Sequence, residues 1–346
     1  QELDIIPLVK PLCKYAITLN DPNQVRYEFE KAVHIAKSGR PGPVWIQIPM
    51  DVQSTKIDKT SLEGFTVDET IPVASNEQVK QIVELLKNAK RPVIISGQGI
   101  RISGCIELLE KFTSKFKIPV VTPFLGIDTI KHDLFQYVGK PGVKGDRAAN
   151  FAMQNSDLII SIGSSLHVTV IGYTYEHFAR EAKKIVVDID ETSHNKNTIK
   201  IDHFVHSDAK KFIEKLMAFS ENVELGNFTK WIEQCNTWKK KYPVCLPEYK
   251  QIKGELNSYL LIDTLCKHSK ENDIFVSDAG GTYYAVSQAI QLTKSGQRYI
   301  PSSAMATMGY SLPAAIGISV ATEKKRVLAL TGDGSFQQNI QELQTV

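Results

Sequence analysis

The sequence predicts an α/β protein built from consecutive domains with parallel sheets. Two observations carry this prediction. Short apolar runs typical of buried strands alternate with stretches of helical composition, and several of these runs end in a glycine-rich turn. Strands that are apolar throughout are buried on both faces, which requires helices on each side of a parallel sheet. With 346 residues, the chain also exceeds one ordinary core, so we expect two or three domains.

Composition and charge are those of an ordinary globular protein. Hydrophobic residues make up 42%, and 41 Lys and Arg against 38 Asp and Glu give a net charge of +3. This near balance gives no support for binding to nucleic acid or to a membrane surface. No apolar run approaches the ~20 residues that cross a bilayer, and no signal peptide is visible. Five scattered cysteines indicate free thiols in a reducing compartment, so we expect a cytoplasmic protein.

The predicted elements fall into three stretches. Residues 1–54 contain a helix over Val25–Lys37, which ends where glycine and proline follow, and a strand over 44–48. The polar residues 53–74 indicate a linker. Residues 75–220 alternate strands with helices such as Ile106–Phe116, and their length suits a six-stranded doubly wound sheet. The apolar runs that predict its strands are 92–96, 119–122, 157–163 and 184–190.

The third stretch, residues 256–346, is again α/β. Helix 259–269 precedes strand 273–277 and a glycine turn at 280–281. Helix 312–321, strand 326–330 and the turn 331–335 follow. The chain opens without a methionine, and residues 341–346 resemble the start of an amphipathic helix. We therefore expect a fragment of a longer protein.

The clearest chemical signal is the turn TGDGS at residues 331–335, between the last strand and a helix. Ligands of α/β proteins bind at the carboxyl ends of parallel strands, and a helix N-terminus presents N–H groups to a phosphate. Asp333 stands between two glycines, where its carboxylate could reach Mg²⁺ on a diphosphate. Taken alone, the tetrapeptide Gly332–Ser335 is equally typical of a tight turn in which Asp and Gly serve only the backbone.

Two longer runs favour the ligand site. Residues 331–343, TGDGSFQQNIQEL, resemble the start of the thiamine diphosphate (ThDP) motif of acetolactate synthases, and residues 305–317, MATMGYSLPAAIG, resemble the thiazolium-side loop of that family. The resemblance extends along the chain. It implies the end of a pyrimidine-binding domain at 1–54, a complete central Rossmann-like domain at 75–220 and the first part of a diphosphate-binding domain at 256–346.

The resemblance also implies roles for single residues in the 331–335 turn. Asp333 would be a ligand of Mg²⁺. Gly334 and Ser335 would pack against the diphosphate, and Gly332 would also belong to the cofactor-binding residues.

Further roles follow for the loops upstream. Met308 would lie between the two rings of ThDP and hold them in a V shape, whereas without this context it would be read as core filling. The backbone of Ala306 would accept from the 4′-amino group, at a position where the family usually has glycine. Gly280 and Gly281 would touch the diphosphate, although residues 281–283 replace the Gln-His-Gln run usual in true synthases.

The central stretch departs from the family at its flavin segment. Where the synthases carry Gly-Ala-Arg-Phe-Asp-Asp-Arg, residues 163–169 read GSSLHVT, without charged side chains to meet a flavin. FAD therefore stays an alternative cofactor that this departure disfavours. His167 and His194 lack metal-ligand spacing, and we expect them on the surface or in loops.

The function implied is that of a ThDP- and Mg²⁺-dependent carboligase. Such an enzyme decarboxylates a 2-oxo acid such as pyruvate and condenses the carbanion with a second 2-oxo acid. The first alternative is another ThDP-dependent decarboxylase, C–C hydrolase or carboligase of unknown substrate. The second, of another class, is a nucleotide-binding module without catalysis.

Two parts of the family's site would lie outside residues 1–346, namely the activating glutamate upstream and a second metal ligand, an Asn, downstream. We therefore expect the isolated chain to bind ThDP poorly and to be inactive. Because ThDP in this family lies between domains of two subunits, the resemblance also implies a homodimer or homotetramer.

Overall fold

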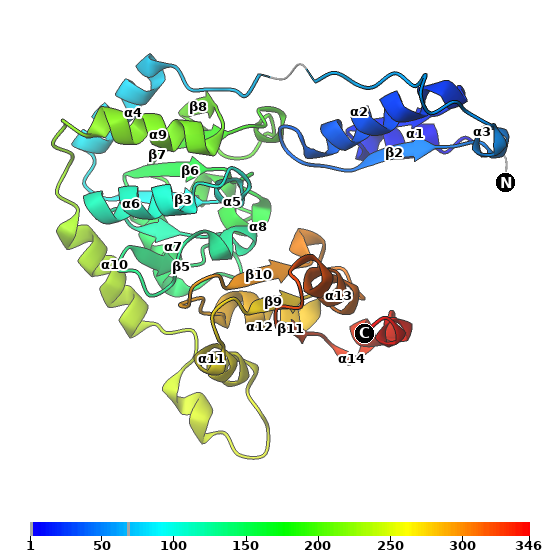
Figure 1. Ribbon diagram of the computed structural model, residues 1–346. Coiled ribbons are helices and arrows are strands. Elements are labelled where there is room, and N and C mark those ends of the chain that lie inside the picture. Colours follow the sequence, from blue (N-terminus) through cyan, green and yellow to red (C-terminus); the bar gives the residue numbers. More distant parts are fainter. Residues whose placement is uncertain (1–2, 68–69) are drawn as a thin grey trace. The chain divides into compact units, whose positions relative to one another are not determined.

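The computed structural model describes residues 3–67 and 70–346 (Figure 1). The chain divides into two compact units, one ending at Pro72 and the other beginning at Val73. This division lies within the stretch that the sequence predicts to be a linker. The second unit holds both of the later predicted stretches. The predicted fold class, α/β with parallel sheets, is confirmed.

The first unit is a small β–α–β arrangement. Strands β1 (Tyr15–Thr18) and β2 (Val44–Gln47) pair in parallel, and helix α2 (Val25–Lys37) connects them. The predicted helix is confirmed at both ends. It stops where Gly39 takes a left-handed φ of +52°, a conformation that glycine adopts without strain. The shorter helical segments are α1 (Ile6–Val9), η1 (Lys10–Leu12), η2 (Pro22–Gln24) and α3 (Met50–Ser54).

The second unit opens with a six-stranded parallel sheet in the order β5-β4-β3-β6-β7-β8, as predicted for a doubly wound domain. Its strands are β3 (Pro92–Ser96), β4 (Val120–Val121), β5 (Tyr137–Gly139), β6 (Leu158–Ile162), β7 (Lys183–Asp188) and β8 (His203–His206). The helical segments along this stretch are α4 (Asn76–Asn88), α5 (Gly99–Ile102), α6 (Ile106–Phe116), η3 (Phe124–Thr129), α7 (Arg147–Gln154), α8 (Val168–Ile171), η4 (Tyr175–His177), η5 (Thr192–His194), α9 (Ala209–Ser220) and α10 (Thr229–Lys241).

Alternating strand residues build one core on each face of this sheet. Ile94 packs with α4, α6 and α9, whereas its neighbour Ile95 packs with α7 and α10. Both side chains are fully buried. Two covered faces explain why the strands of this sheet are apolar throughout, since a residue on either face meets a helix layer.

A three-stranded parallel sheet in the order β10-β9-β11 follows. Its strands are β9 (Ile274–Ser277), β10 (Arg298–Pro301) and β11 (Val327–Leu330). Ser277 pairs with Pro301 on one side and with Leu330 on the other, so the three strands end at the same level. The helical segments here are η6 (Pro247–Gln251), α11 (Ser258–His268), α12 (Gly280–Ala289), η7 (Ser303–Met305), α13 (Ser311–Ala321), α14 (Asp333–Gln337) and η8 (Ile340–Gln344).

Three details differ from the sequence prediction. The predicted glycine turn at 280–281 is the first turn of α12, because Ala279 is extended and lets the helix begin at Gly280. Residues 341–346 contain a 3₁₀ segment in place of the expected α-helix start. His194 lies in the connection between β7 and β8, as the loop alternative expects, but it is not on the surface: it is buried against Asp188, with Nε2 3.2 Å from Oδ2. His167 is exposed, as expected.

All five cysteines are free thiols, as expected. Within residues 3–67 and 70–346, no helix is both long enough and apolar enough to span a bilayer.

Candidate functional site

The candidate site lies where β9, β10 and β11 end. Each strand passes directly into a loop at the same edge of the sheet, the position at which parallel α/β sheets bind ligands. The loops are residues 278–281, 302–310 and 331–335. The residues singled out from the sequence all lie in these three loops or at the first turns of the helices that follow them.

Asp278, the first residue after β9, joins the three loops. Its carboxylate is fully buried and accepts hydrogen bonds from the hydroxyls of Thr331 (2.8 Å) and Ser335 and from the N–H groups of Ala279 (2.8 Å) and Ser311 (3.4 Å). Burial alone would raise the pKa of this carboxyl. The hydrogen bonds, led by that from Ser335, outweigh burial and hold the pKa below its usual 3.8. Asp278 is therefore a buried anion that fixes the geometry of the site.

Ser335 extends this network to the loop after β10. Its hydroxyl donates to Asp278 and accepts the N–H of Gly309 at 2.7 Å. The carbonyl of Gly309 accepts from the side-chain amide of Asn339 at 2.6 Å. The left-handed φ of Gly309, +78°, lets both backbone groups face these partners. Ser335 thus ties the 302–310 loop to the start of α14.

Met308 and Gly334 are brought together by the same arrangement. A Cβ added to Gly334 would stand 3.3 Å from Cε of Met308, closer than an ordinary contact. The Met308 side chain stays 46% exposed, so it borders the site and is not buried in a core. The core-filling alternative for Met308 is therefore disfavoured.

Three glycines border empty space. A Cβ added at Gly280, Gly281 or Gly332 would meet no atom of the described residues within 4 Å. Gly280 also has a left-handed φ of +60°. Glycines beside open space at the carboxyl edge of a sheet allow a ligand to approach the backbone closely. The residues present therefore fit a diphosphate-containing cofactor.

Asp333 is exposed at the first residue of α14. Within residues 3–67 and 70–346, its carboxylate makes no hydrogen bond or ion pair, and no group of three or more His, Cys, Asp or Glu could hold a metal ion. One carboxylate together with phosphate oxygens and water is nevertheless a common way for proteins to bind Mg²⁺. A Mg²⁺ site here would depend on a bound diphosphate.

Ala306 lies on the same loop as Met308 and has the left-handed conformation, with φ +47° and ψ +48°. A residue with a Cβ pays about 1 kcal/mol or more in this region, which glycine occupies freely. This backbone conformation explains how glycine is suited to the position. Among the described residues, Ala306 forms no hydrogen bond with Asp333 or Ser335; its N–H donates to the Ser303 carbonyl at 3.1 Å.

Sequence reasoning missed the role of Asp278. It recognised Gly280 and Gly281 but assigned nothing to the acid before them. A signal was present, because Asp278 directly follows the apolar run 274–276, and an acidic residue at the end of such a buried strand is a candidate for burial. The partners that make it an anion, Thr331 and Ser335, lie more than fifty residues away in the sequence.

Residues 163–169, the segment that departs from flavin-binding synthases, form hydrogen bonds among themselves and with Lys196. The His167 ring accepts the N–H of Thr169 and caps α8, and Leu166 is buried with a left-handed φ of +46°. The Lys196 ammonium donates to the carbonyls of Ser165 (2.5 Å) and Leu166 (3.1 Å). FAD stays a disfavoured prediction.

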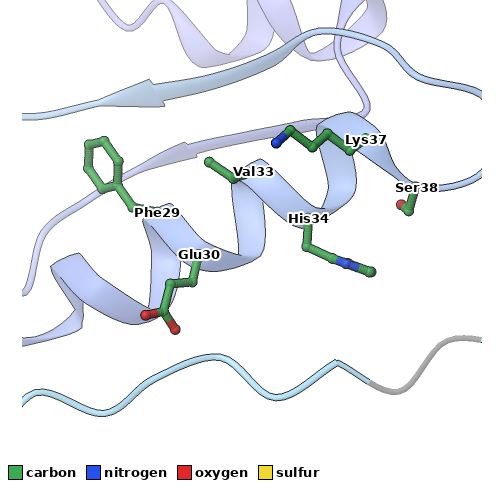
Figure 2. A pocket seen from close by; sticks show the side chains of 6 residues that line it. All are labelled: Phe29, Glu30, Val33, His34, Lys37 and Ser38. Atoms are coloured by element: carbon green, nitrogen blue, oxygen red, sulfur yellow. The ribbon is translucent and has the colours of Figure 1, made fainter.

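A separate hollow of about 520 Å³ lies along α2 in the first unit. Figure 2 shows the apolar side chains Phe29 and Val33 on one flank of the helix and Glu30 and His34 on the other. The hollow is lined by none of the residues that the sequence assigned to the cofactor.

Two stretches of the chain match family models, and the whole chain is similar to known proteins. Residues 79–216 match the model of the thiamine pyrophosphate enzyme central domain, and residues 278–346 match that of the C-terminal TPP-binding domain, where TPP is another name for ThDP. The chain is 33% identical to a probable acetolactate synthase large subunit of Methanocaldococcus jannaschii, over all of this chain and 59% of that protein. It is 33% identical to the acetolactate synthase large subunit of Lactococcus lactis, over 99% of this chain and 59% of that protein.

The chain thus spans about three fifths of the length of these relatives. The TPP-binding domain match begins at Asp278 and includes the three loops of the candidate site. From two domain matches in family order and relatives aligned along its full length, we conclude that the chain belongs to the thiamine pyrophosphate enzyme family.

Proposed function

We propose that this chain is part of an acetolactate synthase-like carboligase that depends on ThDP and Mg²⁺. The observation that carries the proposal is the joining of the three loops around Asp278, with Gly280, Gly281 and Gly332 facing open space and Asp333 free to bind an ion. The similarity to acetolactate synthase large subunits supports the choice of reaction.

Each residue would have one task. Gly280, Gly281 and Gly332 would let the diphosphate approach the backbone, and Asp333 would ligate Mg²⁺ together with diphosphate oxygens. Met308 would support the cofactor's rings from the side. When bound, ThDP supplies the carbanion chemistry that decarboxylation of a 2-oxo acid requires. We also propose that the functional protein is a homodimer or homotetramer.

The substrate assay uses the full-length protein with pyruvate, ThDP and Mg²⁺, and follows acetolactate and acetaldehyde separately. Acetolactate formation is the expected result. Acetaldehyde alone would replace the proposal by a decarboxylase, and an absence of pyruvate consumption would reject both. Sedimentation of the same preparation tests the oligomer, and a monomer at working concentration would contradict it.

Asp333→Ala separates cofactor binding from folding. Because the Asp333 side chain is exposed and makes no hydrogen bond or ion pair among the described residues, we expect the melting temperature of the full-length protein without cofactor to stay unchanged. Mg²⁺-dependent ThDP binding, measured by calorimetry, should fall at least tenfold by analogy with other metal sites, where even indirect partners cost about 10–100-fold. Unchanged Mg²⁺ dependence would remove Asp333 from the metal site.

A second candidate, another ThDP-dependent 2-oxo acid decarboxylase or carboligase, is favoured by one observation. In place of the Gln-His-Gln run of true synthases, Thr282 bonds back to the Ala279 carbonyl at 2.7 Å, and Tyr283 is buried against Phe124. The amide and imidazole groups of that run are therefore absent from this turn. A panel of 2-oxo acids in the same assay distinguishes the two candidates by which acid is consumed fastest.

A further inference from the structure

The C-terminal end of α12 is held by a lysine from the six-stranded sheet. Lys140 directly follows β5, is 1% exposed, and donates from Nζ to the carbonyls of Ile290 (2.7 Å) and Gln288 (3.2 Å). The last carbonyls of a helix have no partner within it and carry partial negative charge. A buried ammonium here therefore satisfies two such groups with charge-assisted bonds.

Further contacts fix the same end of α12. The Gln288 side chain accepts from the Tyr259 hydroxyl and donates to the Lys144 carbonyl, both at 2.5 Å. His132 and Leu292 form a reciprocal pair, in which the N–H of His132 donates to the Leu292 carbonyl (3.0 Å) and Nδ1 accepts the Leu292 N–H (3.1 Å). The segment that ends α12 is thus anchored to the preceding domain.

The opposite end of the same helix carries the diphosphate loop. Helix α12 begins at Gly280 and Gly281 and has ten residues, or about 15 Å at 1.5 Å per residue. A helix of three turns moves nearly as a rigid rod, so a shift at its anchored end is transmitted to the glycines. We infer that Lys140 is a positioning residue, which holds Gly280 and Gly281 in place for the diphosphate through α12. This inference rests on the proposed ThDP site.

The surroundings of Lys140 make its charge costly, and within its own domain the ammonium has only the Tyr137 ring, 5.9 Å away, as a favourable partner among the described residues apart from the charge of Asp146. Asp146 accepts the backbone N–H of Lys140 at 2.8 Å, but its carboxylate makes no hydrogen bond to the ammonium among the described residues. Lys239, Cys266 and His132 also face it. Burial lowers the pKa of Lys140 to about 8. Among the described residues, both hydrogen-bond acceptors of the ammonium belong to the end of α12.

Lys239 provides a matched control. Lys239 and Lys140 both line a cavity of about 250 Å³, and Lys239 is also largely buried. Its ammonium donates to the carbonyls of His132 (3.1 Å) and Tyr137 (2.9 Å), and neither lies on α12. Lys239→Met therefore removes a comparable buried lysine without removing a hydrogen bond to the end of α12.

The test compares Lys140→Met, Lys140→Arg and Lys239→Met in the full-length protein. We expect Lys140→Met to weaken Mg²⁺-dependent ThDP binding about tenfold, within the range seen when groups behind a binding site are removed. Lys140→Arg, which keeps charged donors, should restore most of the affinity, and Lys239→Met should leave it unchanged. Equal losses in both methionine variants, or none in Lys140→Met, would overturn the inference.

Hydrogen exchange without cofactor gives an independent readout. Lys140→Met should speed exchange at residues 280–284, whereas Lys239→Met should not. If the wild type fails to bind ThDP but exchange at 280–284 still differs between the variants, the proposed cofactor is wrong, and the link from Lys140 to Gly280 and Gly281 through α12 stands. If ThDP binds and exchange at 280–284 is the same in all variants, the link is wrong. Lys140→Gln replaces the methionine variant if the latter does not fold.

Discussion

The methyl carbon of Met308 lies 3.3 Å from where a side chain on Gly334 would begin, so the loop after β10 and the start of α14 share one surface. Gly334→Ala should push Met308 aside at a stability cost below about 1 kcal/mol, because the end of a Met side chain adapts readily. ThDP affinity should fall, since Met308 and the diphosphate loop both shift. Calorimetric titration measures this, and an unchanged affinity would contradict the role of the pair.

Gly281→Ala tests whether the open space beside Gly281 is ligand space. The new Cβ meets no atom within 4 Å of the described residues and stands inside a helix, so the free protein should gain up to about 1 kcal/mol. ThDP binding should nevertheless weaken, because the methyl group occupies ligand space. Gly317→Ala is the control, since Gly317 also faces open space in α13 but lies away from the loops. Equal ThDP affinities in both variants would show that the space beside Gly281 does not hold the ligand.

Asp278→Asn should destabilise the protein by about 1–3 kcal/mol at pH 7, because an amide group meets hydroxyl and N–H donors. The pKa of Asp278 lies below its usual 3.8, so the stability it contributes is present above pH 3.8 and is lost as the pH falls through the lowered pKa. Urea unfolding at several pH values should show that the difference in unfolding free energy between wild type and variant shrinks below pH 3.8. A constant gap would argue against a buried anion.

Ala306→Gly should stabilise the free protein by about 1 kcal/mol, since it relieves a left-handed residue of its Cβ. The same substitution in an ordinary helix has the opposite effect, and Ala314→Gly in α13 should cost about 1 kcal/mol. Thermal unfolding of the two variants shows whether each substitution raises or lowers the free energy of unfolding. Destabilisation by both would show that Ala306 is not strained.

The stability of the wild type relative to Lys140→Met should depend on alkaline pH. The pKa of Lys140 is about 8 in the folded protein against 10.5 in an unfolded chain. Below pH 8 the wild type bears the full cost of the buried charge. As the pH rises from 8 toward 10.5, it should gain about 1.4 kcal/mol per pH unit over the variant. Urea titrations from pH 7 to 9.5 measure this, and a difference that stays flat would place the ammonium in water.

Local patterns in the sequence predicted much of the fold. The apolar runs of β3, β6 and β7 and the bounds of α2 and α6 follow from residues that are neighbours in the chain. The glycine position at 280–281 was recognised but its helix was not, because Gly-Gly is a poor helix former and only the packing of α12 against β9 holds it there. The single-residue roles of Gly280, Gly332 and Asp333 stay predictions.

What the sequence alone determined was the class of protein: parallel α/β domains, three glycine-bearing loops and a family motif, all written in contiguous residues. Tertiary structure decided the rest. Asp278 and Ser335 are 57 positions apart, and Lys140 and Ile290 are 150 apart. Such partners meet only because parallel strands end at one edge and because a helix spans from that edge to the neighbouring domain. No local pattern encodes these distances, so they appear only once the chain is folded.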